Sequence, residues 1–168
     1  ITVEPPENGW TTEEIMNVTY FCDYKLSYPL SVEYLGNDFK LSHYSKSQAK
    51  KRLVPATLSY KDKQFANATV VKPDKETMIY NIVLFPDICE VENVKPFVIN
   101  GVKMYDSFED TLNALGDNYN YKSDDCLMYN DKNTNESLYS LFFEDDKLVH
   151  INVDFKFNID LPLYRDLR

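Results

Sequence analysis

The sequence contains two histidines, and they are the first residues to consider for acid–base chemistry. His43 lies in a polar segment, and His150 lies on the polar side of an alternating run. A catalytic histidine acts together with a nucleophile, a carboxylate or a metal ion. No local signature supplies such a partner for either residue. We therefore interpret both histidines as structural or exposed.

The segment 131–136 begins like a calcium-binding loop, because side chains with oxygen atoms recur at alternate positions. A calcium loop of this type needs glycine at its sixth position and glutamate at its twelfth. This chain has Glu136 and Phe142 at those positions. We predict a polar turn here rather than a calcium site.

Carboxylates cluster at Asp124-Asp125 and again at 144–146. Neighbouring residues in a strand point to opposite faces, so such clusters more often mark solvated turns than acid/base pairs. The chain also lacks a phosphate-binding loop, a dinucleotide fingerprint and a zinc motif. We expect no catalytic residue, no cofactor and no metal site.

The three cysteines, Cys22, Cys89 and Cys126, show no metal-ligand spacing. One disulfide with one free thiol, or three buried thiols, would both fit this count. The cellular compartment does not follow from the cysteines alone.

The net charge of −9 lies in the second half of the chain. Residues 1–84 carry 10 Lys/Arg and 10 Asp/Glu, whereas residues 85–168 carry 8 and 17. This acidity opposes binding to a phosphate backbone, so we expect no nucleic-acid partner. The basic cluster of Lys46 and 50–52 reads as a solvated surface. No run approaches the ~20 apolar residues of a membrane span.

A first helix is predicted over 10–22. Thr11 and Glu14 have the spacing of a capping box, in which each side chain bonds the other residue's backbone N–H. The β-branched and aromatic residues 18–21 make the C-terminal end of this helix uncertain.

Two further helices are predicted from a capping residue at one end and a glycine at the other. The second spans 25–36, with Ser27 as the cap and Gly36 as the stop. The third is capped by Ser107 and stopped by Gly116.

Alternation of apolar and polar residues predicts antiparallel strands, most of them in hairpins. These strands span 39–41, 57–60, 65–71, 78–85, 97–99, 102–104, 119–122, 126–129, 137–143 and 148–157. Asn100-Gly101 suits a tight hairpin turn. In the last strand, Val149 and every second residue after it should face one way. Residues 86–96 are the predicted link between two halves, and 159–168 an edge strand or an ordered coil.

Three pairs of segments resemble each other and indicate an internal duplication. They are 35–39 with 115–119, 58–63 with 141–146, and 79–83 with 149–153, at offsets of 80, 83 and 70. The predicted fold class is α+β, a tandem repeat of a short helix packed on an antiparallel sheet. Residues 1–9 are the predicted remnant of a tether, 10–93 the first repeat and 94–168 the second. The two repeats should pack as one compact unit, since a small copy alone buries little surface.

Most of residues 9–157 resembles uncharacterised predicted lipoproteins and secreted proteins of Gram-positive anaerobes. The segments that carry the resemblance are GWTTEEIMNVTYFCDYKLSYPLSVEYLGNDF, INGVKMYDSFEDTLNALGDNYNY and SLFFEDDKLVHINVDF. In shape the pattern is similar to the tandem helix-plus-sheet repeats of β-lactamase inhibitory proteins and to small outer-membrane assembly lipoproteins. The resemblance implies an extracellular or cell-surface bacterial protein. Its only membrane attachment would be a lipid anchor upstream of residue 1.

The 13 tyrosines and 10 phenylalanines are many for a chain of 168 residues. They could form a recognition surface on a sheet or simply fill the core. The expected function is non-enzymatic binding of another macromolecule, either an envelope protein or a polysaccharide, through a sheet face or an inter-repeat groove. The alternatives are a hydrolase acting on cell-wall polymer and a structural spacer.

Overall fold

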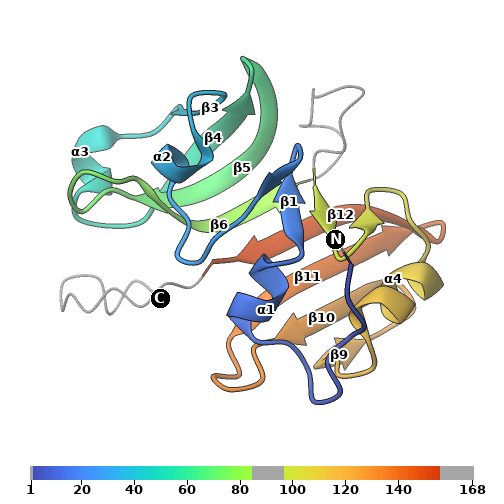
Figure 1. The fold of residues 1–168 in the computed structure, drawn as a ribbon. Coiled ribbons are helices and arrows are strands. Elements are labelled where there is room, and N and C mark those ends of the chain that lie inside the picture. The colour runs from blue at the N-terminus through green and yellow to red at the C-terminus, as the bar shows by residue number, and fades with distance from the viewer. Residues whose placement is uncertain (1, 85–96, 156–168) are drawn as a thin grey trace. The chain divides into compact units, whose positions relative to one another are not determined.

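The structure is a computed structural model that describes residues 2–84 and 97–155 (Figure 1). These residues form mostly antiparallel sheet with a few short helices, so the α+β class is confirmed. They divide into two compact units. Unit 1 holds 2–27 and 97–153, and unit 2 holds 28–84 and 154–155. The predicted repeat boundaries, and the packing of the repeats as one compact unit, stay predictions.

Unit 1 combines helices with two antiparallel sheets, and Figure 1 shows both of its helices on one face of the larger sheet. The helices are α1 (Thr12–Met16) and α4 (Phe108–Leu115). The smaller sheet has the order β2 (Tyr24–Lys25), β1 (Thr19–Phe21), β7 (Val98–Ile99) and β8 (Val102–Lys103). The larger sheet follows chain order through β9 (Tyr121–Lys122), β10 (Cys126–Asn130), β11 (Ser137–Glu144) and β12 (Lys147–Asp154).

Buried aromatic side chains with a satisfied polar end hold the core of unit 1 together. Trp10 is almost fully buried, and its Nε1 donates to the Leu115 carbonyl at 2.7 Å. The Tyr129 hydroxyl donates to the Gly116 carbonyl at 2.9 Å. Both bonds satisfy carbonyls at the C-terminal end of α4, which the helix itself leaves without partners.

The predicted helix over 10–22 is wrong beyond its first turns. Its capping box is confirmed, since Thr11 Oγ1 accepts from Glu14 N at 3.1 Å and Glu14 Oε2 from Thr11 N at 3.0 Å. The helix ends at Met16 and the chain then enters β1. The buried Thr19 hydroxyl lies 2.6 Å from the Tyr139 hydroxyl. This contact is non-local, so the tertiary environment overrides the local helical pattern.

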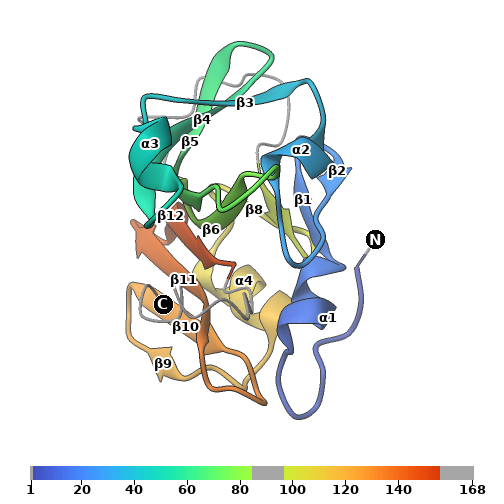
Figure 2. The same cartoon turned by 90° about the vertical axis from the view of Figure 1, so that its left-hand side faces the viewer.

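Unit 2 consists of two one-turn helices and a four-stranded antiparallel sheet (Figure 2). The helices are α2 (Val32–Leu35) and α3 (Lys46–Ala49). The sheet follows chain order through β3 (Phe39–Ser42), β4 (Val54–Tyr60), β5 (Lys63–Val71) and β6 (Met78–Leu84). Figure 2 shows β3 running between α2 and α3.

The predicted second helix, 25–36, is also too long. Its cap is Ser31, which accepts from Tyr34 N at 3.1 Å, and not Ser27. The residues just before Ser31 are not helical, and there the Leu30 carbonyl accepts from Ile79 N at 2.9 Å. The stop at Gly36 is confirmed. The third helix is confirmed at both ends, Ser107 and Gly116.

The predicted hairpins are confirmed, and their turns use positive φ angles. The turn residues are Lys61, Asp62, Asn100, Gly101, Asp145 and Asp146. The expected facing of Val149 is wrong, because the register of β11 and β12 shifts there and Leu148 is buried instead. Helix α3 was not predicted. The segments 86–96 and 159–168 lie outside the described residues.

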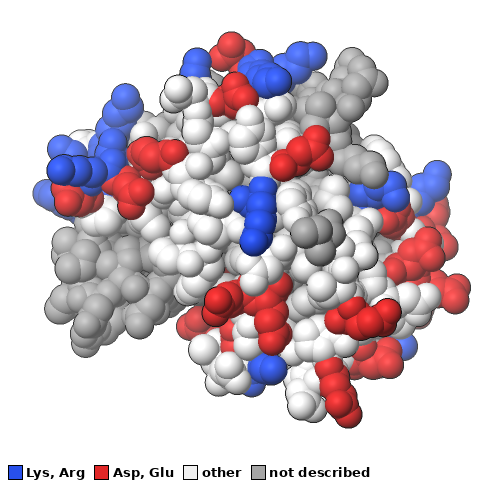
Figure 3. Space-filling model, viewed as in Figure 1, with Lys and Arg blue, Asp and Glu red and all other residues white. Residues whose placement is uncertain are grey.

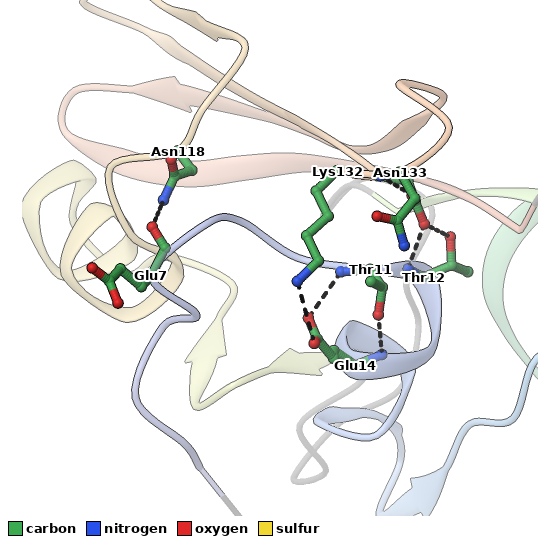
Figure 4. Close-up of polar contacts among 8 residues, drawn as sticks. Glu7, Thr11, Thr12, Glu14, Asn118, Lys132 and Asn133 are labelled. Carbon is green, nitrogen blue, oxygen red and sulfur yellow. Dashed lines mark hydrogen bonds and ion pairs between the residues drawn. The ribbon is translucent and has the colours of Figure 1, made fainter.

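The N-terminal segment lies against unit 1. The Asn100 side chain bonds both backbone groups of Val3, at 2.8 and 2.9 Å. Asn118 Nδ2 donates to the Glu7 carbonyl at 2.8 Å (Figure 4). The interpretation of residues 1–9 as the remnant of a tether refers to chain upstream of residue 1. This interpretation stays a prediction.

The two helix-stop glycines provide a matched test of backbone strain and close packing. Both have φ near +90°, and a Cβ at Gly116 would lie 2.8 Å from Pro5 Cβ, whereas a Cβ at Gly36 would meet nothing within 4 Å. We expect Gly36→Ala to lower the free energy of unfolding by roughly 1–3 kcal/mol. Gly116→Ala should cost more because it adds the clash.

Denaturant unfolding followed by circular dichroism measures both losses. In a double-mutant cycle, Pro5→Gly should remove the excess cost of Gly116→Ala. Equal costs for the two alanine variants would show that the contact with Pro5 is unimportant.

Candidate functional site

The open face of the unit 2 sheet follows from the alternation of its strands. In β4, Val54 and every second residue after it are buried, and the residues between them are partly or fully exposed. Cross-strand partners lie on the same face of a sheet. Thr57 therefore shares the open face with its partner Asn67.

The register of the sheet places two rows of three residues side by side on this face. One row is Pro55, Thr69 and Asn81, and the other is Thr57, Asn67 and Val83. The pairing is regular across both rows, since the register shifts of the two strand pairs lie beyond them. Cross-strand neighbours of this kind have Cβ atoms about 5 Å apart.

These rows line a hollow of about 350 Å³ within unit 2. Its lining residues are His43, Pro55, Ala56, Thr57, Asn67, Ala68, Thr69, Asn81 and Val83. The volume is within the range of small-ligand sites. Four of the six residues in the two rows have polar side chains. Ala56 and Ala68, which lie between the row residues along β4 and β5, complete the lining.

The polar groups of the hollow can accept and donate hydrogen bonds to a ligand. Among the described residues, no hydrogen bond engages the side chains of Thr57, Asn67 or Thr69. A threonine hydroxyl or an asparagine amide offers both a donor and an acceptor. Asn81 is held in place, since its Nδ2 donates to Asp154 Oδ1 at 2.9 Å.

His43 stands at the rim of this hollow, just beyond the end of β3. Its Nδ1 lies 3.2 Å from the hydroxyl of Ser42. Both residues lie at the surface, and the described lining residues include no carboxylate that could orient the imidazole. The pair therefore lacks the third group of a nucleophile–base–acid arrangement.

His150 lies in the other unit, on β12, and does not join His43. Its ring meets Phe142 edge-on, with the ring centroids 5.1 Å apart. Burial lowers the pKa of His150, because desolvation disfavours the charged imidazolium. The two histidines are thus separate residues with different surroundings.

The segment 131–136 is a turn, as predicted, and Asp131 organises it. Its Oδ2 accepts from the backbone N and the hydroxyl of Thr12, each at 2.8 Å. Its Oδ1 accepts from Asn133 N at 2.7 Å and Thr134 N at 3.0 Å. The carboxylate thereby ties the β10–β11 turn to the start of α1.

Two opposing effects act on the pKa of Asp131. Burial raises the pKa, while hydrogen bonds from Thr134, Thr12 and Asn133 lower it and together prevail. The pKa in the folded protein is therefore below its ordinary value, and the ionised form stabilises the fold.

The carboxylate clusters lie in surface turns. Asp124 and Asp125 are exposed, and 144–146 includes the turn between β11 and β12. In the described part of the chain, no group of three or more His, Cys, Asp or Glu side chains could hold a metal ion. None of the described helices is long and apolar enough to cross a membrane.

Cys22 and Cys126 are both buried, and neither forms a disulfide within the described residues. Burial, followed by the nearby charge of Asp125, raises the pKa of Cys126. Cys89 lies outside the described residues.

None of the residues that line the hollow was predicted as a site, and His43 was interpreted as structural or exposed. The sequence signal was the polar or small residue at every second position of three adjacent strands. An expected tyrosine-rich recognition face does not line this hollow. Exposed tyrosines are scattered instead over both units, at positions 24, 28, 34, 105 and 121.

Comparison with protein-family models, with curated proteins and with solved structures gave no match. The resemblance to predicted lipoproteins of Gram-positive anaerobes therefore stays a prediction.

Asp131→Asn tests the tie between the turn and α1. The amide cannot accept all four bonds, so we expect a loss of about 2 kcal/mol in the free energy of unfolding at neutral pH. A lowered folded-state pKa contributes stability that is present above the unfolded pKa and is lost as pH falls through the folded pKa.

The gap between wild type and Asp131→Asn should therefore shrink as pH falls below the ordinary aspartate pKa of about 3.9. Fluorescence of Trp10, the single tryptophan, measures unfolding of unit 1 across this range. A gap that stays constant down to the lowest pH would contradict the role of the ionised carboxylate.

Proposed function

We propose that this protein binds another macromolecule, without acting as an enzyme, through the open face of the β3–β6 sheet. One observation carries the proposal. Thr57, Asn67 and Thr69 line a hollow of about 350 Å³, and no hydrogen bond engages their side chains within the described residues. These side chains are therefore available to a partner that approaches the open face.

A hydrolase acting on cell-wall polymer is the alternative. It would need a nucleophile, a base and an orienting group within mutual reach. Ser42 and His43 supply a contact between a hydroxyl and an imidazole at 3.2 Å, but no carboxylate joins them among the lining residues. This arrangement favours binding over catalysis.

The charges of the two units differ and bear on the partner. The described residues of unit 1 carry five Lys/Arg and 16 Asp/Glu, and those of unit 2 carry nine and six. Figure 3 shows Lys and Arg gathering over α3, and Asp and Glu over α4 and neighbouring turns. A net charge of −11 on unit 1 argues against a nucleic-acid partner and favours solubility.

We further propose that the chain is a tandem repeat, as the matching of elements supports. In each copy a hairpin with a positive-φ turn precedes a short helix, a glycine ends the helix, and four antiparallel strands follow. The copies are β1 to β6 and β7 to β12. The glycines are Gly36 and Gly116.

Irregularities of pairing recur at matching places in both copies. Register shifts occur at Leu58/Ser59 in β4 and Tyr129/Asn130 in β10, an offset of 71. They recur at Thr69/Val70 in β5 and Phe142/Phe143 in β11, an offset of 73. The predicted match of 58–63 with 141–146 does not follow this strand order.

From the resemblance described above, we propose that the protein lies outside a bacterial cell, secreted or held at the surface by a lipid anchor upstream of residue 1. In this proposal the partner is a component of the cell envelope.

Sedimentation with isolated cell envelopes of a Gram-positive anaerobe tests the function. We expect the full chain to sediment with them and Thr69→Phe, which fills the hollow, to lose at least ~10-fold in affinity, about 1.4 kcal/mol. Asn113→Phe is the matched control, because it adds the same ring at an exposed position of α4 that does not line the hollow.

Equal sedimentation of both variants and wild type would refute a role for the hollow. Release of soluble fragments from the envelopes that His43→Ala abolishes would instead establish the hydrolase. Absence of any binding would favour a structural spacer.

A further inference from the structure

The described residues that line the hollow in unit 2 carry no fixed charge. None of them is Lys, Arg, Asp or Glu. A strongly charged ligand would lose hydration in such a site without gaining a counter-charge. Because unit 2 as a whole bears nine basic and six acidic residues in its described part, the neutrality is particular to this surface.

The backbone of this face is not available for recognition. Strand β4 pairs with β3 on one side and β5 on the other, and β5 pairs with β4 and β6. An added peptide strand needs an open sheet edge for its main-chain bonds. A ligand on this face must therefore be recognised by side chains.

Those side chains suit a ligand rich in hydroxyl groups. Thr57, Asn67 and Thr69 each offer a donor and an acceptor, as a sugar hydroxyl does. They stand about 5 Å apart across strands and about 7 Å apart along β5, so several can engage one chain of sugar rings. Pro55 and Val83 add apolar surface for the carbon–hydrogen faces of the rings.

The aligned positions of unit 1 differ from those of the hollow in side-chain size. The matched register shifts align Thr57 with Met128, and Thr69 with Phe142. Met128 and Phe142 are larger than Thr57 and Thr69, whereas Ser140, which the same offset aligns with Asn67, is smaller than its counterpart. Two of the three polar positions of the hollow thus have a larger side chain at the aligned position of unit 1.

We infer that the ligand of this hollow is an uncharged glycan chain, held by Thr57, Asn67 and Thr69. The inference rests on the proposed function, since it names the chemistry of the macromolecule that the same face binds.

Calorimetric titration of the full chain tests the ligand class. The probes are linear hexamers of N-acetylglucosamine, glucose and mannose, with polygalacturonate and polylysine as charged comparisons. We expect at least one neutral hexamer to bind, with equal affinity at low and high salt because no ion pair forms. Charged polymers should not compete with it.

Two variants each remove the hydrogen-bonding group of one side chain while nearly keeping the volume of that side chain. Thr69→Val and Asn67→Leu should each weaken binding of that hexamer about 5–10-fold, the worth of a hydrogen bond. Asn113→Leu, at an exposed position of α4, is the matched control and should bind like wild type. Thermal unfolding by circular dichroism verifies that each variant is folded.

The outcomes separate this inference from the proposed function. In one outcome no neutral hexamer binds, but a charged polymer or an envelope protein does, and Thr69→Phe blocks that binding. This result would overturn the glycan assignment and leave the face as a binding site. Failure of Thr69→Phe to affect any ligand would overturn both. Binding of a neutral hexamer that Thr69→Val and Asn67→Leu leave unchanged would also overturn the assignment.

Discussion

The register of the antiparallel strands is the constraint on which the surface of each unit depends. A slip of β5 by one residue against β4 would move Asn67 to the face opposite its partner Thr57. The register shift at Leu58/Ser59 and the tight turn at 61–62 both restrict such a slip. The two polar rows of unit 2 therefore depend on features outside the rows that fix the pairing of β4, β5 and β6.

Features that depend on a few neighbouring residues were predictable from the sequence. The capping box of Thr11 and Glu14, the cap at Ser107 and the stops at Gly36 and Gly116 are local chemistry, and the structure confirms them. A cap needs only one side chain and the backbone of the next turn. The fold class followed from the same local patterns together with the strand alternation.

The errors arose where distant residues decide the structure. Local propensity left the end of the first helix uncertain, and the bond between Thr19 and Tyr139, which are 120 positions apart, keeps that segment in β1. Leu30 lies outside the second helix, and its carbonyl accepts from Ile79 N. The hollow has the same origin, since its members come from separate strands and meet only through their register. No spacing along the chain could have brought Asn67 and Asn81 together.

The strands of the two units carry side chains of different size at some positions. In unit 1, Phe142 packs against His150, whereas in unit 2 Thr69 pairs with Asn81. Small side chains on a sheet face forgo contact area and would weaken a minimal domain. A face that carries small polar side chains despite this cost is therefore a reason to look for the ligand on unit 2.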